Sequence, residues 1–346
     1  MNCKLSIIAI FFFLVGALAM GNPAQGAPAE SIELKIMHFL PATHSMHQDM
    51  FVPWAKTLEE RTGGRVKVVL YPGELLGKVK DTFDATLSGI ADIGCAYFAA
   101  TPGRFPLHSV YELPLMFFDA NVASRIIWER FEKEESLRAE FREVKVLWLF
   151  CTAPMHVHMS KKPVRVLEDM NGMKVRSVGG VRATVVKMLG AIPVVIATPD
   201  AYMALERGTV DGTVSTWEII KSFKFYEVTR YHTVANLWVG VFYVVMNRKR
   251  WESLPSDIQK IMEGLSGARA ADLSATAFNK LDIDGLEMVK GLKGHEIINL
   301  PPAEQPKWRN AVKPLWDEWV TEKESKKLPG KKILDETLRL AEKYSK

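Results

Sequence analysis

The sequence predicts two α/β lobes that the chain crosses several times. Stretches rich in β-branched and apolar residues alternate with amphipathic helical stretches, and the alternation resumes with new pieces in the second half. No fixed-period repeat and no long low-complexity linker is present. A length of 346 residues allows roughly two domains of about 150 residues each. Alternating strands and helices favour mostly parallel sheets covered on both faces.

The first half of the chain gives the clearest helix at residues 45–61. Met50, Trp54 and Leu58 are spaced four residues apart and share one face, and Gly63 and Gly64 follow as a stop signal. A weakly alternating strand is expected before it, at residues 34–39. The remaining elements expected in this half are strands at 66–71, 90–96 and 144–151, helices at 78–88 and 121–142, and a proline-rich loop at 99–119.

The second half contains a strong helix start at residues 198–200. Thr198 can cap the helix, Pro199 suits its first position, and Asp200 faces the positive end of the helix dipole. A capping-box pattern at Ser256 and Gln259 opens one long helix that we expect to reach Lys290. The other elements expected here are strands at 155–160, 173–178, 193–197, 210–216, 237–247 and 296–300, and helices at 181–189, 201–207 and 305–322.

The N-terminal segment has the pattern of a secretory signal peptide, residues 1–26. Lys4 is the only charge before Glu30, and residues 5–20 are almost entirely apolar and are followed by small residues. The apolar run is shorter than the roughly 20 residues that a bilayer core requires. Cleavage is expected near residues 24–26, with residues 17–19 as a competing site and an uncleaved anchor as the alternative. We therefore expect a protein exported to the periplasm and not embedded in the membrane after cleavage.

Composition excludes several classes of protein. Forty-five Lys and Arg against forty Asp and Glu leave a net charge of +5, and no basic block concentrates it, so nucleic acid is not an expected partner. After the leader, only Cys95 and Cys151 remain. Both lie in apolar, strand-like runs, so we expect two free buried thiols, although an exported protein can form a disulfide.

The sequence shows no assembled catalytic motif. It lacks a GxSxG elbow, a phosphate loop, a GxGxxG turn, a HExxH pair and a CxxC pair, and no cofactor is expected. His156 and His158 share one face of a predicted strand, and with His44 or His47 they form a possible metal site. Histidines that line a ligand cleft or that are simply hydrogen-bonded fit better, because no carboxylate or cysteine follows at metal-site spacing. A secreted metal-dependent hydrolase remains the alternative of another class.

Ordered sequence blocks resemble the solute-binding proteins of TRAP transporters, the DctP-like family of periplasmic receptors. The resemblance covers about residues 32–320. Its blocks are 62–65 (TGGR), 71–77 (YPGELLG), 89–92 (GIAD), 104–106 (RFP), 112–114 (ELP), 168–176 (EDMNGMKVR), 189–193 (LGAIP), 200–208 (DAYMALERG), 210–212 (VDG) and 251–255 (WESLP). It implies a periplasmic-binding-protein fold with crossing segments and a long connecting helix. Lobe I is then expected at 27–153 and 241–281, and lobe II at 154–240 and 282–346.

The resemblance also implies a function and a site. Receptors of this kind close on a small organic acid and deliver it to the small and large membrane subunits of the transporter, and they are not enzymes. The family holds the substrate carboxylate with an arginine that corresponds to Arg176. The chemistry agrees, because a guanidinium offers a fixed fork of donors that matches the two oxygens of a carboxylate.

Other positions differ from the sialic-acid and C4-dicarboxylate branches of the family. His156 stands where a second arginine is common, Ser215 where those receptors carry asparagine, and Tyr97 and Phe98 where some relatives are acidic. Fewer fixed charges and more rings, Trp217 included, favour a ligand with one carboxylate and an apolar or aromatic body. A C4-dicarboxylate or sugar acid stays open, because His156 could donate to a further oxygen.

Each predicted site residue has an assigned role. Arg176 anchors the carboxylate, His156 and Ser215 orient the ligand, and the aromatic residues enclose it. His44, on the loop after the first strand, is a further lining residue. A sensor subunit that passes its ligand state to a membrane receptor is a third possible role for the chain.

Overall fold

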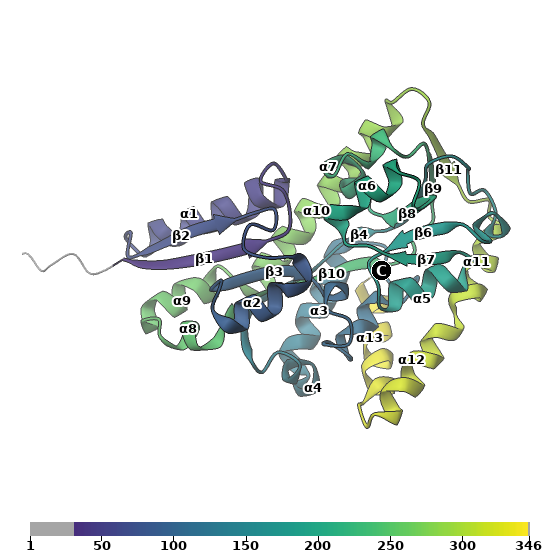
Figure 1. Cartoon of the computed structure of the whole chain (residues 1–346). Coiled ribbons are helices and arrows are strands. Elements are labelled where there is room, and N and C mark those ends of the chain that lie inside the picture. The colour runs from purple at the N-terminus through teal and green to yellow at the C-terminus, as the bar shows by residue number, and fades with distance from the viewer. Residues whose placement is uncertain (1–30, 345–346) are drawn as a thin grey trace, which may run out of the picture.

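The computed structural model describes residues 31–344, which form two mixed β-sheets surrounded by helices (Figure 1). The predicted signal peptide lies outside the described residues. The first sheet has the strand order β2-β1-β3-β10-β4, and the second has the order β11-β9-β5-β8-β6-β7. The strands are β1 (Ile32–His38), β2 (Val66–Tyr71), β3 (Ile93–Tyr97), β4 (Val144–Pro154), β5 (His156–Met159), β6 (Lys174–Ser177), β7 (Ile192–Val195), β8 (Gly212–Ser215), β9 (Tyr231–Val234), β10 (Val239–Asn247) and β11 (Glu296–Asn299). The expected α/β fold is confirmed.

Each sheet contains one strand that runs against its neighbours. In the first sheet, β1 pairs in parallel with β2 and β3, whereas β10 is antiparallel to both β3 and β4. In the second sheet, β5 is antiparallel to β8 and β9, while β6 is parallel to β7 and β8. β10 is buried along its whole length except at Asn247, as its continuous apolar run requires for a strand in the middle of a covered sheet.

Two of the segments in which the chain crosses between the sheets are bonded to each other. One crossing leads from β4 to β5 through Met155, and the other leads from β9 to β10 through Leu237 and Trp238. The Met155 N–H donates to the Trp238 carbonyl at 2.8 Å, and the Leu237 N–H donates to the Met155 carbonyl at 2.9 Å. These bonds join the two crossing segments into a short connection between the lobes. The first lobe is the one built on the first sheet, and the second lobe is the one built on the second sheet.

Helices cover both sheets, and one of them reaches from one lobe to the other. The α-helices are α1 (Val52–Arg61), α2 (Thr82–Ser88), α3 (Ala120–Lys133), α4 (Glu135–Ala139), α5 (Val181–Met188), α6 (Ala201–Glu206), α7 (Trp217–Ser222), α8 (Arg248–Glu252), α9 (Ser256–Gly264), α10 (Gly267–Lys290), α11 (Glu304–Val312), α12 (Pro314–Ser325) and α13 (Gly330–Tyr344). The short helices are η1 (Met46–Phe51), η2 (Val79–Asp81), η3 (Phe98–Ala100), η4 (His108–Glu112), η5 (Leu167–Met170), η6 (Thr198–Asp200) and η7 (Phe225–Glu227), of which η1 is a π-helix and the others are 3₁₀-helices.

Helix α10 packs on β4 in the first lobe and on α7 in the second, so it is the long connecting helix (Figure 1). Gly285 makes the second contact possible. A Cβ at this position would lie 2.3 Å from the Trp217 carbonyl oxygen, so any larger residue would push α7 away.

The prediction of one helix from Ser256 to Lys290 was wrong, because the helix is interrupted between Gly264, where α9 ends, and Gly267, where α10 begins. Gly267 has φ of +68°, a conformation that glycine adopts without strain, and a Cβ there would lie 3.3 Å from the Trp128 ring. The helix expected at 305–322 is also two helices. It restarts at Pro314, which occupies the first position of α12, where its missing N–H costs nothing.

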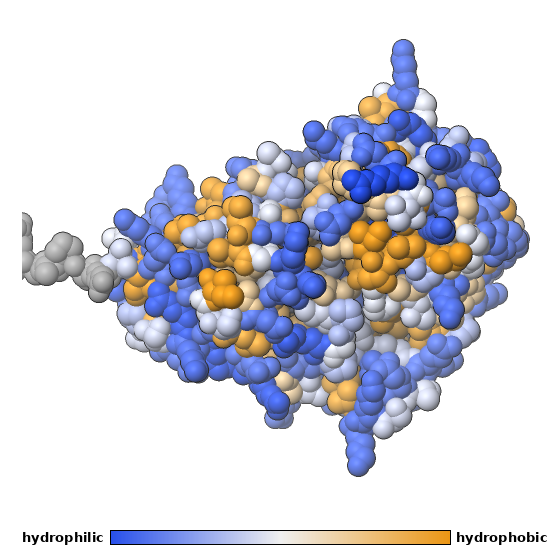
Figure 2. All heavy atoms as spheres, in the orientation of Figure 1, coloured by the Kyte–Doolittle hydropathy of each residue, from blue (hydrophilic) through white to orange (hydrophobic). Residues whose placement is uncertain are grey.

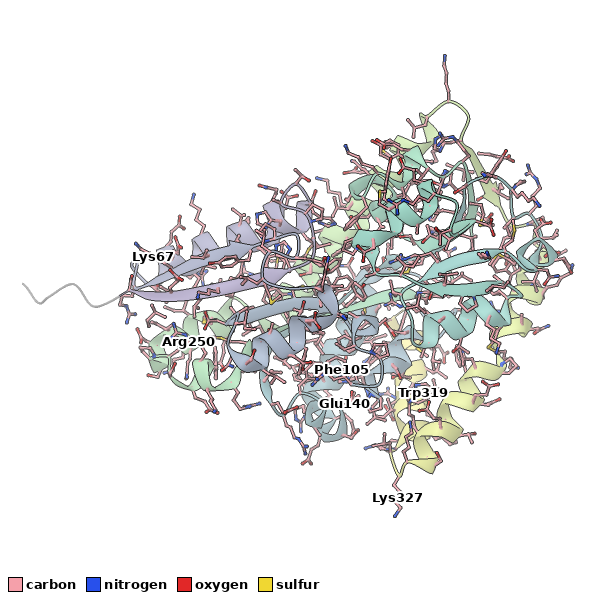
Figure 3. All side chains as sticks on the ribbon, viewed as in Figure 1. Lys67, Phe105, Glu140, Arg250, Trp319 and Lys327 are labelled. Atoms are coloured by element: carbon pink, nitrogen blue, oxygen red, sulfur yellow. The ribbon has the colours of Figure 1, made fainter. Side chains whose placement is uncertain are left out.

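The C-terminal helices return to the first lobe. Helix α13 packs on α3, and the Trp319 indole of α12 donates to the Ser109 hydroxyl at 2.7 Å. Lys327, in the turn between α12 and α13, points away from the rest of the chain (Figure 3). The strands of the first sheet fall in residues 32–154 and 239–247, and those of the second in 156–234 and 296–299. The exact lobe boundaries stay a prediction.

Buried and exposed apolar residues follow the sheets. Cys95 and Cys151 are both buried in the first sheet as free thiols, as expected, and burial raises the pKa of each.

Figure 2 shows apolar side chains on the face of the second lobe where β6 and β7 lie in Figure 1. Ile192 and Val195 of the edge strand β7 are among the exposed apolar residues.

Candidate functional site

A cavity lies where the two lobes meet at the crossing segments. The first lobe contributes the loop after β1, the ends of β3 and β4, part of β10 and one ring from α10. The second lobe contributes β6, β8 and the starts of α5, η6 and α7. The lining residues are Phe39, Leu40, Tyr97, Thr152, Met155, Arg176, Ser177, Val178, Arg182, Thr198, Val214, Ser215, Thr216, Glu218, Ile219, Trp238, Phe242 and Phe278.

Arg176 projects from β6 and is held rigidly in the cavity wall. Its Nε donates to the Ile196 carbonyl at 2.8 Å, and its Nη2 donates to the Thr198 hydroxyl at 2.9 Å. Ile196 and Thr198 follow β7, which pairs in parallel with β6, so the sheet register itself brings these acceptors to the guanidinium. Within residues 31–344, Nη1 makes no such bond and remains available to a ligand.

The charge of Arg176 has no carboxylate partner among the described residues. The side chain is only 2% exposed, and burial lowers its pKa to about 10, so it stays protonated at neutral pH. Tyr97 favours the charged form, whereas Arg182 opposes it. A buried cation without a counter-ion is costly, and an anionic ligand would supply the missing partner.

Arg182, in contrast, is already paired across the lobes. Its Nη2 lies 2.6 Å from the Glu112 carboxylate, and both side chains are buried. Glu112 belongs to η4 of the first lobe and Arg182 to α5 of the second. Burial raises the pKa of the Glu112 carboxyl, and the Arg182 charge opposes that shift. This pair fastens the two lobes beside the cavity without consuming the charge of Arg176.

A second buried pair joins the lobes through His44 and Glu218. The His44 Nε2 lies 2.5 Å from Glu218 Oε1, and the His44 Nδ1 accepts a hydrogen bond from the Met46 N–H at 2.9 Å. Because Nδ1 acts as an acceptor, the ring is neutral with its proton on Nε2. Glu218 lines the cavity, whereas His44 lies behind it.

Three of the seven predicted site residues lie on the cavity wall: Arg176, Tyr97 and Ser215. The side chains of His156, Trp217, Phe98 and His44 are buried elsewhere. Phe98 packs in the aromatic core of the first lobe, against Phe105 at 4.6 Å between ring centroids. Direct ligand contact by these four residues stays a prediction, and their positions favour supporting roles.

His156 and Trp217 belong to a layer of rings that pack against one another in tilted and edge-to-face arrangements behind the wall. The Trp217 ring centroid lies 5.4 Å from that of His156 and 5.0 Å from that of His158. Burial lowers the pKa of His156 to about 3 and the pKa of His158 well below its usual value, so both rings are neutral. His156 Nδ1 accepts from the Asn236 N–H at 3.3 Å, and His158 Nε2 donates to the Ser215 carbonyl at 3.1 Å.

These positions do not assemble the alternative metal site. His44 pairs with Glu218, whereas His156 and His158 face Trp217 and each other. Across residues 31–344, no group of three His, Cys, Asp or Glu side chains is arranged to hold a metal ion.

The place of Trp217 leads to a testable prediction. Replacing it with phenylalanine should lower the stability of the ligand-free protein by about 1–2 kcal/mol, because the smaller ring leaves part of the layer unfilled. The relative affinity for aromatic and aliphatic acids should stay the same within twofold. Urea unfolding and calorimetry measure the two effects, and a selective loss of aromatic ligands would restore Trp217 to the binding surface.

Sequence reasoning missed Arg182, Glu112 and Glu218 as site residues. Thr198 was identified only as a helix cap, which was wrong, because its side chain caps neither η6 nor α6 and its hydroxyl instead accepts a hydrogen bond from Arg176. Arg182 and Glu112 are 70 residues apart, and no local pattern connects them. The available signal was that Glu218 directly follows Trp217, which was itself a predicted site residue.

Comparison with known proteins identifies the family. Residues 36–323 match the bacterial extracellular solute-binding proteins of family 7, the DctP family. The chain belongs to this family. It is 26% identical to the outer membrane transporter protein TsaT of Comamonas testosteroni, over 93% of this chain and 94% of that protein.

Two solved structures show the same fold. A TRAP solute-binding protein from a marine metagenome, specific for aromatic acid ligands and in complex with metahydroxyphenylacetate, has a TM-score of 0.87 at 29% identity, covering 91% of this chain and all of that one. A TRAP periplasmic solute-binding protein from Desulfovibrio salexigens, in an open complex, has a TM-score of 0.78 at 34% identity, covering 91% of this chain and 97% of that one.

Membership of the DctP family settles the broad class. Proteins of this family are solute-binding receptors that work with TRAP transporters, and their homologues are periplasmic. None of the helices in the described range is both long and apolar enough to cross a membrane.

Proposed function

We propose that this protein is a periplasmic receptor for a small organic acid with one carboxylate and an apolar or aromatic body. The observation that carries this proposal is Arg176, a buried guanidinium that faces the cavity without a carboxylate partner in the described chain. A ligand carboxylate would complete its hydrogen bonds and neutralise its charge in a site from which water is largely excluded.

The wall around Arg176 favours an aromatic body over a second anionic group. Five rings line the cavity: Phe39, Tyr97, Trp238, Phe242 and Phe278. Arg182, the other cation in the wall, is already neutralised by Glu112. The metagenome relative, specific for aromatic acids, supports the same class of ligand. A C4-dicarboxylate would need a further cation for its second carboxylate, and the only other cation in the described wall, Arg182, is already paired.

The arrangement of the lobes supports a receptor that closes on its ligand. This chain has a higher TM-score with the ligand complex of the metagenome protein than with the open complex, although it is more identical to the latter. The two buried pairs, Glu112–Arg182 and His44–Glu218, can form only when the lobes are together. A ligand that contacts both lobes shifts the equilibrium toward this state.

The partners follow from the family. We infer that the closed receptor delivers its ligand to the small and large membrane subunits of a TRAP transporter, and that it does so without catalysing a reaction. Export through residues 1–26 would place it in the periplasm, beside such subunits.

A thermal-shift screen against aromatic and aliphatic mono- and dicarboxylates tests the proposal. An acid at 100 times its Kd stabilises the protein by about 2.7 kcal/mol, which corresponds to about 5 °C for a chain of this size. We expect the largest shifts from aromatic monocarboxylates and none from the matching amides, which lack the charge. Equal shifts with acid and amide, or no shift with any acid, would contradict the proposal.

A further inference from the structure

Glu218 is a second fixed charge in the cavity, and one of its oxygens is unused. The side chain is 1% exposed, and Oε1 is bonded to His44. Oε2 is buried and makes no hydrogen bond within residues 31–344. His44 cannot turn to serve it, because its Nδ1 is held by the Met46 N–H. Glu218 therefore presents a single acceptor oxygen that only a further donor can satisfy.

The other unpartnered polar atoms of the wall are donors. Trp238 Nε1 and Arg182 Nε are buried and form no hydrogen bond in the described part of the chain. They can donate to a ligand carboxylate, as can Arg176 Nη1. None of these three groups accepts a hydrogen bond. The wall also carries neutral hydroxyls, Ser215 among them, but Glu218 Oε2 is a buried carboxylate oxygen that has no partner in the described chain.

Glu218 and Arg176 are separate features of the same cavity. They do not form an ion pair, and the pKa of Arg176 reflects burial, Tyr97 and Arg182 rather than Glu218. Arg176 comes from β6, whereas Glu218 comes from α7 and is bonded through its backbone N–H to Asp282 of α10 at 3.1 Å. A bound acid would therefore turn its carboxylate toward Arg176 and away from the carboxylate of Glu218, where like charges repel.

We propose that Glu218 Oε2 accepts a hydrogen bond from a hydroxyl group on the body of the bound acid, so that the cavity selects hydroxylated acids over their unsubstituted parents. This inference rests on the proposed function, because it requires the carboxylate to be held at Arg176. The hydroxyl would satisfy Glu218 Oε2, which is otherwise buried without a partner in the described chain. An unsubstituted ring would instead seal a charged oxygen into the closed cavity without a partner.

Hydrogen bonding explains why the effect should be large. A hydrogen bond to a charged group contributes more than one between neutral groups, and a buried charged acceptor without a partner is penalised. Sites built to bond a substrate hydroxyl therefore reject analogues that lack it far more strongly than apolar sites reject a missing methylene. We expect a preference of at least tenfold.

Calorimetry with phenylacetate and its 2-, 3- and 4-hydroxy derivatives tests this selectivity. In the wild type, at least one hydroxylated isomer should bind ten or more times tighter than phenylacetate. Glu218→Gln keeps the shape and the bond to His44 but replaces the charged acceptor Oε2 with a neutral NH₂ group. The ligand hydroxyl can bond this group only without charge assistance, so the ratio should fall at least fivefold. A wild type that binds phenylacetate as tightly as every hydroxylated isomer, or a ratio that survives in Glu218→Gln within twofold, would overturn the proposal.

Glu112→Gln is the matched control. It changes the other buried carboxylate between the lobes, so it should weaken phenylacetate and its hydroxylated derivatives equally and leave their ratio unchanged. The ratio within each variant cancels any general loosening of the closed state. Binding of all four acids without discrimination would remove the role of Glu218 but keep the receptor function, whereas the absence of a shift with any acid in the thermal-shift screen would remove both.

Discussion

Replacing Arg176 with methionine should weaken the binding of organic acids by about two orders of magnitude, or roughly 3 kcal/mol. The guanidinium is held by the Ile196 carbonyl and the Thr198 hydroxyl, so it meets the ligand in a fixed orientation at little entropic cost. Methionine fills similar space and cannot donate. Calorimetry against the best acid from the thermal-shift screen measures the loss, and an unchanged affinity would disprove the anchor role.

The same substitution should not lower the stability of the ligand-free protein. Arg176 is a buried cation with no carboxylate partner in the described chain, so an apolar replacement relieves a desolvation cost. Two further variants complete the test. Arg176→Lys keeps the charge but loses the fork, so we expect an intermediate affinity. Arg165→Met removes an exposed arginine paired with Glu296 on the surface of the second lobe, and affinity should remain within twofold of the wild type.

The sequence was sufficient to predict three lining residues, Arg176, Tyr97 and Ser215, but not the rest of the cavity wall. Arg176 lies in a block with recognisable spacing, and local chemistry explains its function once it stands at a strand end. Its neighbours come from distant segments. Tyr97 arrives from β3 and Glu218 from α7, and their approach depends on how the two lobes meet. Residue patterns do not encode that relative placement, so Phe98 and Trp217 could not be recognised as core residues.

Strands were predicted more accurately than helix boundaries. The run at residues 66–71 coincides with β2, because a β-rich segment between turn residues has few alternatives. The long helix failed at Gly267, where the neighbouring Trp128 and a left-handed turn decide the break. Periodicity continued through that point, and only tertiary contacts interrupted it. Likewise, the antiparallel course of β5 and β10 follows from the crossings between lobes and not from composition.

Acidification should destabilise the protein steeply between pH 6.5 and pH 5. Burial lowers the pKa of His38, His156 and His232 to about 3 in the folded state, whereas unfolded histidines titrate near 6.5. In this window the unfolded chain binds more protons than the folded one, so the free energy of unfolding falls as the pH falls. Each such histidine contributes about 1.4 kcal/mol per pH unit once the pH is well below 6.5.

Asp282 acts in the opposite direction and limits the net effect. Burial raises the pKa of its carboxyl to about 7, so the folded protein holds a proton there that the unfolded chain releases above about pH 4. Four histidines, His158 included, against the carboxyls of Asp282 and Glu112 leave a net uptake of at least about two protons on unfolding, or roughly 2.7 kcal/mol per pH unit. Urea unfolding followed by tryptophan fluorescence at pH 7.5, 6.5, 5.5 and 5.0 measures this slope.

His156→Asn removes one titrating group and should reduce the slope by about 1.4 kcal/mol per pH unit, because the asparagine does not ionise. A free energy of unfolding that is constant from pH 7.5 to 5.0 would show that these rings are accessible to protons in the folded protein. It would contradict the burial of the ring layer behind the cavity wall.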